Sequence, residues 1–247
     1  MTIDLGEFIA GGYFLSRHVG PDWTGTPMRR VTLANGHTPR RYFPDDWTLS
    51  WCHKEREKRR AEAVGWGIDA SDLDALTAWA DGAFEVAFGA WNVLFTLDAA
   101  RAVAHRWLAR APEVELWGVG LRRDLVRSYC AATAPPPPVP GYSPMGSGGT
   151  HLTACARGAP LAAGGTPLGF EVLFEDLGST FQSPQSLHRD EEEIFRAVGV
   201  TPNGHGLLAT CEDALACCRY LVAEEATSAH PFAWFPWLLV AYPLRAS

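Results

Sequence analysis

The order of strand-like and helix-like segments along the chain is the feature that most constrains its fold. Apolar or alternating runs, typical of buried strands, lie at 114–121, 168–175 and 234–242. Helix-like segments separate them, but strands and helices do not alternate in the regular way that parallel βαβ units require. We therefore predict an α+β fold in which several helices pack on a largely antiparallel sheet.

Three segments carry the clearest helix signals. Apolar residues repeat at helical spacing over 98–110, which predicts a helix there. Ser71 and Thr210 occupy N-cap positions with acids just after them, which predicts helices over 72–82 and 210–225. Weaker patterns predict helices over 54–63, 122–132 and 190–198, the last beginning near 185, and strands over 31–34 and 151–157.

Proline and glycine indicate where some of these segments lie. Pro236 falls within the last predicted strand and therefore places that strand at a sheet edge or a bulge. Gly118 and Gly120 follow a predicted strand, but a dinucleotide-binding turn needs a third glycine where Arg123 stands. We interpret the two glycines as a tight turn between a strand and a helix.

Charge is distributed unevenly along the 247 residues. Residues 1–60 contain 10 basic and 7 acidic residues, whereas residues 61–247 contain 11 basic and 21 acidic residues. We expect 1–60 to be a basic N-terminal segment docked on an α+β body at 61–247, with a Pro/Gly-rich loop at 134–149. The acidic body is a poor match for nucleic-acid phosphates and suits a basic protein partner.

The ends of the chain and its cysteines indicate a cytoplasmic protein without membrane contact. The acidic N-terminus MTIDLGEFIAGGYF differs from a signal peptide, and the longest apolar run, 232–242, is too short to cross a bilayer. In a reducing compartment most of the six cysteines are expected to be free and buried. Cys211, Cys217 and Cys218 share a predicted helix at a spacing that fits zinc poorly, so we expect no metal site and no cofactor.

No motif selects a catalytic residue. The candidates for a dispersed catalytic site are three histidines, His151, His188 and His205. Most of the ten tryptophans lie in apolar stretches and are assigned to the core. The candidate binding residues are acids of the body and two tryptophans beside an Arg-rich turn: Asp176, Glu191, Glu192, Glu193, Trp47 and Trp51.

Three strand-like segments carry a resemblance to known proteins. ELWGVGL (115–121), PLGFEVLFEDLGSTFQS (167–183) and FAWFPWLLVAYPL (232–244) resemble, as a set and in order, small uncharacterised bacterial cytoplasmic proteins of the immunity or antitoxin type. The resemblance spans about 95–244 and implies a role in occluding a toxin. Such relatives carry a His-Ser or a Cys after the Gly-rich turn, where this chain has residues 181–184 (FQSP), so no catalytic residue is implied.

Two hypotheses of different classes follow. The first is a protein-binding module that occludes a basic partner, such as a toxin, through an acidic face. The second is an enzyme, a hydrolase or transferase, with a dispersed site that contains histidine. The enzyme requires a cleft in which a histidine lies within hydrogen-bond reach of Cys, Ser, Asp or Glu.

Overall fold

In the part of the chain that the structure describes, six antiparallel strands form the centre, in the order β2-β1-β3-β6-β4-β5. Helices pack on both faces of this sheet, so the predicted α+β fold with a largely antiparallel sheet is confirmed. The strands are β1 (Phe8–His18), β2 (Arg40–Phe43), β3 (Val114–Arg122), β4 (Thr166–Asp176), β5 (Thr180–Gln182) and β6 (Phe235–Tyr242). The computed structural model describes residues 3–18, 40–43, 63–83, 86–87, 93–111, 113–133, 150–176, 180–187, 189–225 and 232–245.

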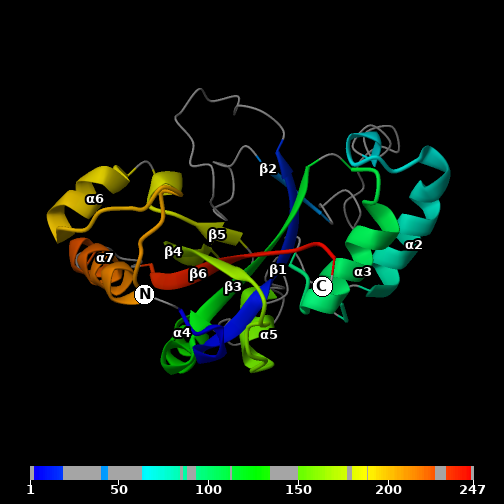
Figure 1. The fold of residues 1–247 in the computed structure, drawn as a ribbon. Coiled ribbons are helices and arrows are strands. Elements are labelled where there is room, and N and C mark those ends of the chain that lie inside the picture. The colour runs from blue at the N-terminus through cyan, green and yellow to red at the C-terminus, as the bar shows by residue number, and fades with distance from the viewer. Residues whose placement is uncertain are drawn as a thin grey trace, which may run out of the picture.

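The described helices form two layers with the sheet between them. The pairs α2 with α3 and α6 with α7 pack on one face at its two ends, whereas α4 and α5 cover the other face (Figure 1). None of the described helices is both long enough and apolar enough to span a membrane. The α-helices are α2 (Leu73–Ala83), α3 (Leu97–Trp107), α4 (Val126–Thr133), α5 (Thr150–Ala156), α6 (Glu191–Val198) and α7 (Cys211–Glu224). Short 3₁₀ turns are η1 (Leu5–Glu7), η3 (Ala70–Asp72), η5 (Arg123–Leu125) and η6 (Gln185–Leu187).

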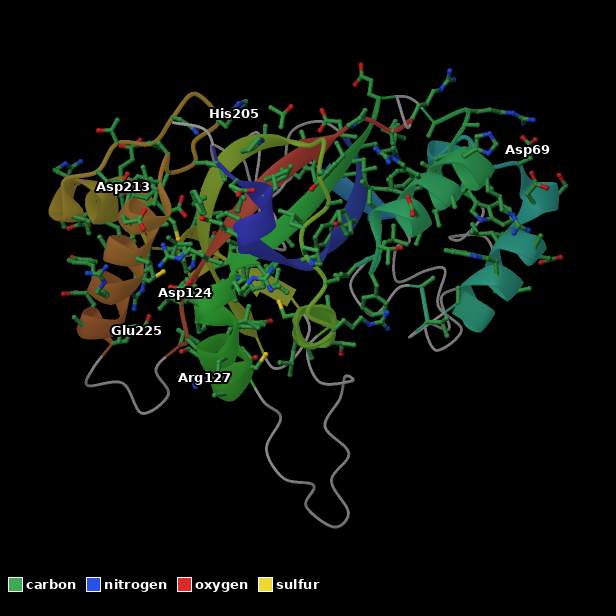
Figure 2. The ribbon with its side chains drawn as sticks, turned by 60° about the horizontal axis from the view of Figure 1, so that its bottom comes forward. Asp69, Asp124, Arg127, His205, Asp213 and Glu225 are labelled. Carbon is green, nitrogen blue, oxygen red and sulfur yellow. The ribbon has the colours of Figure 1, made fainter. Side chains whose placement is uncertain are left out.

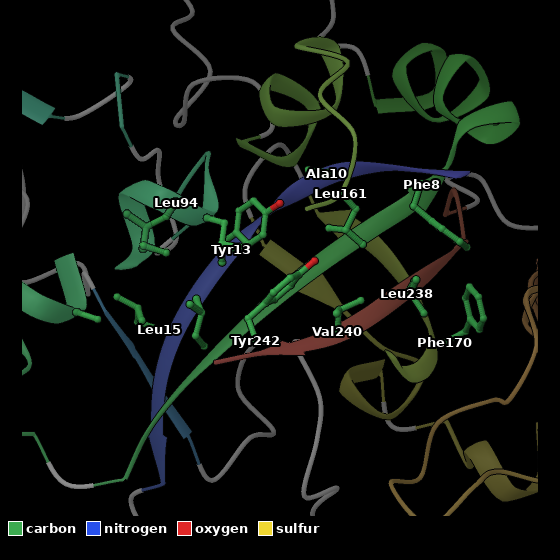
Figure 3. Close-up of a cluster of buried hydrophobic side chains, with 14 of the residues drawn as sticks. Phe8, Ala10, Tyr13, Leu15, Leu94, Leu161, Phe170, Leu238, Val240 and Tyr242 are labelled. Carbon is green, nitrogen blue, oxygen red and sulfur yellow. The ribbon is translucent and has the colours of Figure 1, made fainter. Parts of the chain in front are cut away.

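Two tyrosines fasten the segment after α5 to the middle of the sheet. The hydroxyl of Tyr13 accepts a hydrogen bond from the N–H of Ala162 at 3.0 Å, and the hydroxyl of Tyr242 donates to the Ala162 carbonyl at 2.6 Å. The two rings lie close together (Figure 3) and meet edge to face, with centroids 5.7 Å apart. Both rings lie over Gly118 of β3, where a Cβ would come within 2.7 Å of the Tyr242 ring. Burial raises the pKa of both phenols, so they stay protonated and keep these hydrogen bonds at neutral pH.

Most strong helix and strand patterns are confirmed. The helix predicted over 98–110 is α3, whose buried face carries Ala100, Val103, Ala104 and Trp107. The N-cap at Thr210 is confirmed, because its side chain accepts the N–H of Asp213 at 3.0 Å and opens α7. The strands predicted over 114–121 and 168–175 are β3 and β4, and the helix predicted over 72–82 is α2.

The strand predicted over 151–157 is wrong, because these residues belong mainly to the helix α5. The short alternation of apolar and polar residues is typical of a strand, but here it lies in a helix. The three-residue spacing of Leu152 and Cys155 decides the outcome, since in a helix both pack against the core under α5.

The predicted edge position of the strand with Pro236 and the predicted turn at Gly118 and Gly120 are both wrong. β6 is a central strand between β3 and β4, and Pro236 is tolerated because pairing with β3 begins only at Trp237. Gly118 and Gly120 lie inside β3 rather than in a turn, and they leave room for side chains from neighbouring strands. The helix expected from about residue 185 begins later, at Glu191, because η6 is a separate turn.

Several predicted segments lie wholly or almost wholly outside the described residues. These are the strand at 31–34, the helix at 54–63 apart from Ala63, and the loop at 134–149. Residues 8–18 and 40–43 of the N-terminal segment are strands of the same sheet as the acidic body.

We predict that Gly118→Ala destabilises the fold, by about 1–3 kcal/mol, because the added methyl would overlap the tyrosine rings. Gly82→Ala is the matched control, since Gly82 lies in α2 with nothing within 4 Å of a Cβ and should gain about 0.5–1 kcal/mol of stability. Urea unfolding measured by tryptophan fluorescence gives both values. Equal effects of the two substitutions would contradict the close packing of the tyrosines over β3.

Candidate functional site

Acidic side chains are concentrated on α6 and α7. Residues 189–225 contain eight acidic residues against three arginines. Seven of these acids are exposed or half-buried, and α6 and α7 lie side by side at one end of the sheet (Figure 1). We call these seven the acidic surface: Asp190, Glu191, Glu192, Glu193, Glu212, Asp213 and Glu224.

The acids of α6 lie at its N-terminal end, where Asp190 is the N-cap. The carboxylate of Asp190 caps the helix by accepting the N–H groups of Glu192 at 2.9 Å and Glu193 at 3.3 Å. Negative charge is favourable at this end of a helix because the free N–H groups carry partial positive charge. The helix holds its position through the buried side chain of Ile194 and ends at Gly199, whose φ of 79° suits glycine.

A buried carboxylate, Glu225, fastens the C-terminal end of α7 to the segments just before α6 and just before β6. Its side chain, only 4% exposed, forms an ion pair with Arg189 at 3.0 Å, next to the cap of α6. It also accepts hydrogen bonds from the N–H of Phe232 at 2.9 Å and the indole of Trp234 at 3.2 Å. Glu225 and Asp213 are labelled in Figure 2 toward opposite ends of α7.

At the other end of α7, one acid of the surface shares an arginine with Asp124. Arg122 binds both carboxylate oxygens of Asp124, at 2.8 and 3.0 Å, and Glu212 at 2.7 Å. The hydrogen bonds from Arg122 lower the pKa of Asp124, so this carboxylate stays charged at neutral pH. The largest group of surface acids, Asp190 to Glu193, lies at the start of α6, beside the C-terminal end of α7.

The inner face of α7 carries the three cysteines whose spacing fits zinc poorly. Cys211, Cys217 and Cys218 are buried and free, in contact with the core over the sheet. Burial raises the pKa of Cys211 and of Cys217 to about 11, and raises that of Cys218 as well. Among the described residues, no group of three or more His, Cys, Asp or Glu side chains is arranged to hold a metal ion.

The structure brings most of the predicted acidic binding residues to one end of the sheet. Glu191, Glu192 and Glu193 form the first turn of α6, with Glu192 and Glu193 exposed. Asp176 is the last residue of β4, two positions after Phe174, whose ring stacks on Phe232 at 4.2 Å. That end of β4 therefore contacts Phe232, whose N–H donates to the buried carboxylate of Glu225. Trp47 and Trp51 lie outside the described residues.

The two candidate catalytic histidines that the structure describes, His151 and His205, lie on different elements. His205 is exposed in the loop between α6 and α7, and its N–H donates to the Asn203 side chain at 2.9 Å. Within the described part of the chain, the His205 imidazole has no hydrogen bond or ion pair. His151 lies in α5, and His188 lies outside the described residues.

Two residues of this region, Arg189 and Glu225, were not found by sequence reasoning. No motif marks a glutamate after a helix as buried, because its partners come from the start of α6 and from the residues before β6. The one available signal was Trp234, a tryptophan in an apolar segment whose indole N–H needs an acceptor when buried.

Comparison with known proteins returned no match: no protein-family model, no curated protein and no solved structure matches the chain. The resemblance to immunity and antitoxin families therefore stays a prediction drawn from the strand segments.

We predict that Glu225→Ala lowers the free energy of unfolding by about 2–4 kcal/mol, because it leaves Arg189 and two N–H donors without their acceptor. Glu224→Ala, at the exposed neighbouring position, should change it by less than about 0.5 kcal/mol. Urea denaturation of both variants tests the difference. Similar stabilities would contradict the proposed role of buried Glu225 in holding these segments together.

We also predict that Cys211 and Cys217 react with iodoacetamide at pH 8 about a hundredfold more slowly in the folded protein than in urea. Only the thiolate reacts, and a pKa of about 11 leaves little thiolate at that pH. Mass spectrometry of the labelled peptides gives the rates. Equally fast labelling in both states would show that these thiols are accessible and ionised.

Proposed function

We propose that the protein is a binding module of the immunity or antitoxin type that occludes a basic protein, such as a toxin, through the acidic surface of α6 and α7. The observation that carries this proposal is the excess of exposed carboxylates over arginines on two packed helices. Complementary charge of this kind accelerates association and selects a basic partner over an acidic one.

Rigidity of the surface supports the proposal. The helices that carry the acids are anchored by the Asp190 cap, the Thr210 cap and the buried Glu225, so their backbone needs little ordering on binding. Preorganised surfaces lose less conformational entropy when they bind and therefore gain affinity.

An exposed apolar side chain adds a contact that charge alone does not give. Val222 of α7 is 48% exposed. Interfaces combine a desolvated apolar centre with a polar rim, so Val222 is our candidate for an apolar contact made by α7 outside the acidic surface.

The enzyme hypothesis has less support from the described residues. It requires a histidine within hydrogen-bond reach of a nucleophile or an acid. The two histidines whose side chains are described, His105 and His205, form no such contact with the described residues.

The proposal predicts that the chain binds the product of a toxin-like gene immediately upstream of its own and rescues cells from it. Replacing Glu192 and Glu193 together by Gln should weaken that binding about tenfold or more at low salt, because two exposed charges facing a basic partner are lost. The matched control is the double variant Glu7→Gln with Asp72→Asn, which removes two exposed acids from other elements.

Isothermal titration calorimetry at about 50 mM and about 500 mM salt measures both effects, since screening shortens the reach of exposed charges. The wild-type affinity should fall at high salt, and the control should bind like the wild type. Absence of binding and rescue, salt-independent affinity, or equal losses in the two double variants would contradict the proposal.

A further inference from the structure

A groove lies at the end of the molecule away from the acidic surface. It has a volume of about 670 Å³ and is formed by the outer side of α3, the start of β3 and the residues after β6. Figure 1 shows α3 and the C-terminus together at this end, with α6 and α7 at the other. A volume of this size falls in the range of sites that bind small organic molecules.

The wall of the groove is mostly apolar. Alanines of α3 and of the turn after it line the groove together with Leu108, Val114 and Leu244. Small-molecule sites typically have this composition, an apolar wall with a few polar groups that fix the orientation of the ligand.

Its polar groups are mainly basic. Of the described residues that line the groove, Arg101, His105 and Arg245 are basic and Glu113 is the one acid. The Nε of Arg101 donates to the Pro243 carbonyl at 3.3 Å, which holds the guanidinium at the groove wall. Its two terminal nitrogens, the Arg245 guanidinium and the His105 imidazole have no hydrogen bond or ion pair with the described residues.

The polar groups of this groove are mainly basic, whereas the body of the chain is acidic. The segment 61–247 has 21 acidic residues against 11 basic ones, yet the described lining of the groove brings together two arginines and a histidine with one carboxylate. Guanidinium groups are well suited to carboxylate and sulfonate oxygens, because their N–H donors form paired hydrogen bonds with them.

We propose that this groove binds a small amphiphilic organic anion, with its carboxylate or sulfonate between Arg101 and Arg245 and its apolar part along α3. An amphiphilic cation is the opposing case, since its ammonium group would have to rely on Glu113 against the two arginines. This site is independent of the proposed function, because it uses basic groups and elements other than α6 and α7.

The test is a titration of the folded protein with 1-anilinonaphthalene-8-sulfonate, followed by competition with dodecanoate and with dodecylamine. We expect the dye fluorescence to saturate at one equivalent, and dodecanoate to displace the dye at least tenfold more effectively than dodecylamine. Equal displacement by the two competitors, or absence of dye binding, overturns the proposal.

Variants of the groove locate the site. Replacing Arg101 and Arg245 together by Gln should weaken dye binding at least tenfold. The control is Arg127→Gln with Arg219→Gln, two exposed arginines on α4 and α7, and it should bind like the wild type. An affinity unchanged by the first pair, or lowered equally by both pairs, overturns the site.

A second variant guards against a loss of binding through misfolding. Ala102 is exposed on α3 and lines the groove, so Ala102→Glu adds a carboxylate there at a position where a helix tolerates glutamate. It should weaken dye binding at least tenfold while the urea midpoint stays near that of the wild type. Unchanged dye affinity in this folded variant contradicts the placement of the anion in the groove.

Discussion

The fold depends on hydrogen bonding along both edges of β3. One edge pairs with β1, near the start of the chain, and the other with β6, near its end. The pairs Phe8 with Arg122 and Leu121 with Trp237 join segments that are far apart in sequence. Closing such long loops costs chain entropy before the contacts form, so most of the core must assemble together around this strand. Gly118 within β3 is part of the same arrangement, because it lets Tyr13 and Tyr242 lie over the strand.

Local signals in the sequence predicted the elements whose formation depends on neighbouring residues. The Thr210 cap and the apolar spacing along α3 gave the correct helices, because both act within one or two turns. Buried strands such as β3 were equally clear, since a continuous apolar run needs cover on both faces. The α+β class followed from the order of these elements.

Features that depend on distant partners could not be predicted. The position of β6 in the centre of the sheet is set by where its pairing with β3 begins, one residue after Pro236. The helical state of 151–156 depends on the core that Leu152 and Cys155 join. At the candidate site, the acids of α6 were visible in the sequence, but Arg189 and Glu225 acquire their roles only through contacts across α6, α7 and β6.

The two ends of the molecule differ in charge and therefore in the chemistry they offer. One end presents carboxylates on two anchored helices, and the other presents arginines along an apolar groove. The central proposal concerns the first, and hydrogen–deuterium exchange of the chain with and without the basic partner tests it most directly. The proposal predicts slower exchange in α6 and the C-terminal half of α7 on binding, with α2 and α3 unchanged. Protection confined to α2 and α3, or absent from α6 and α7 at saturating partner, would contradict it.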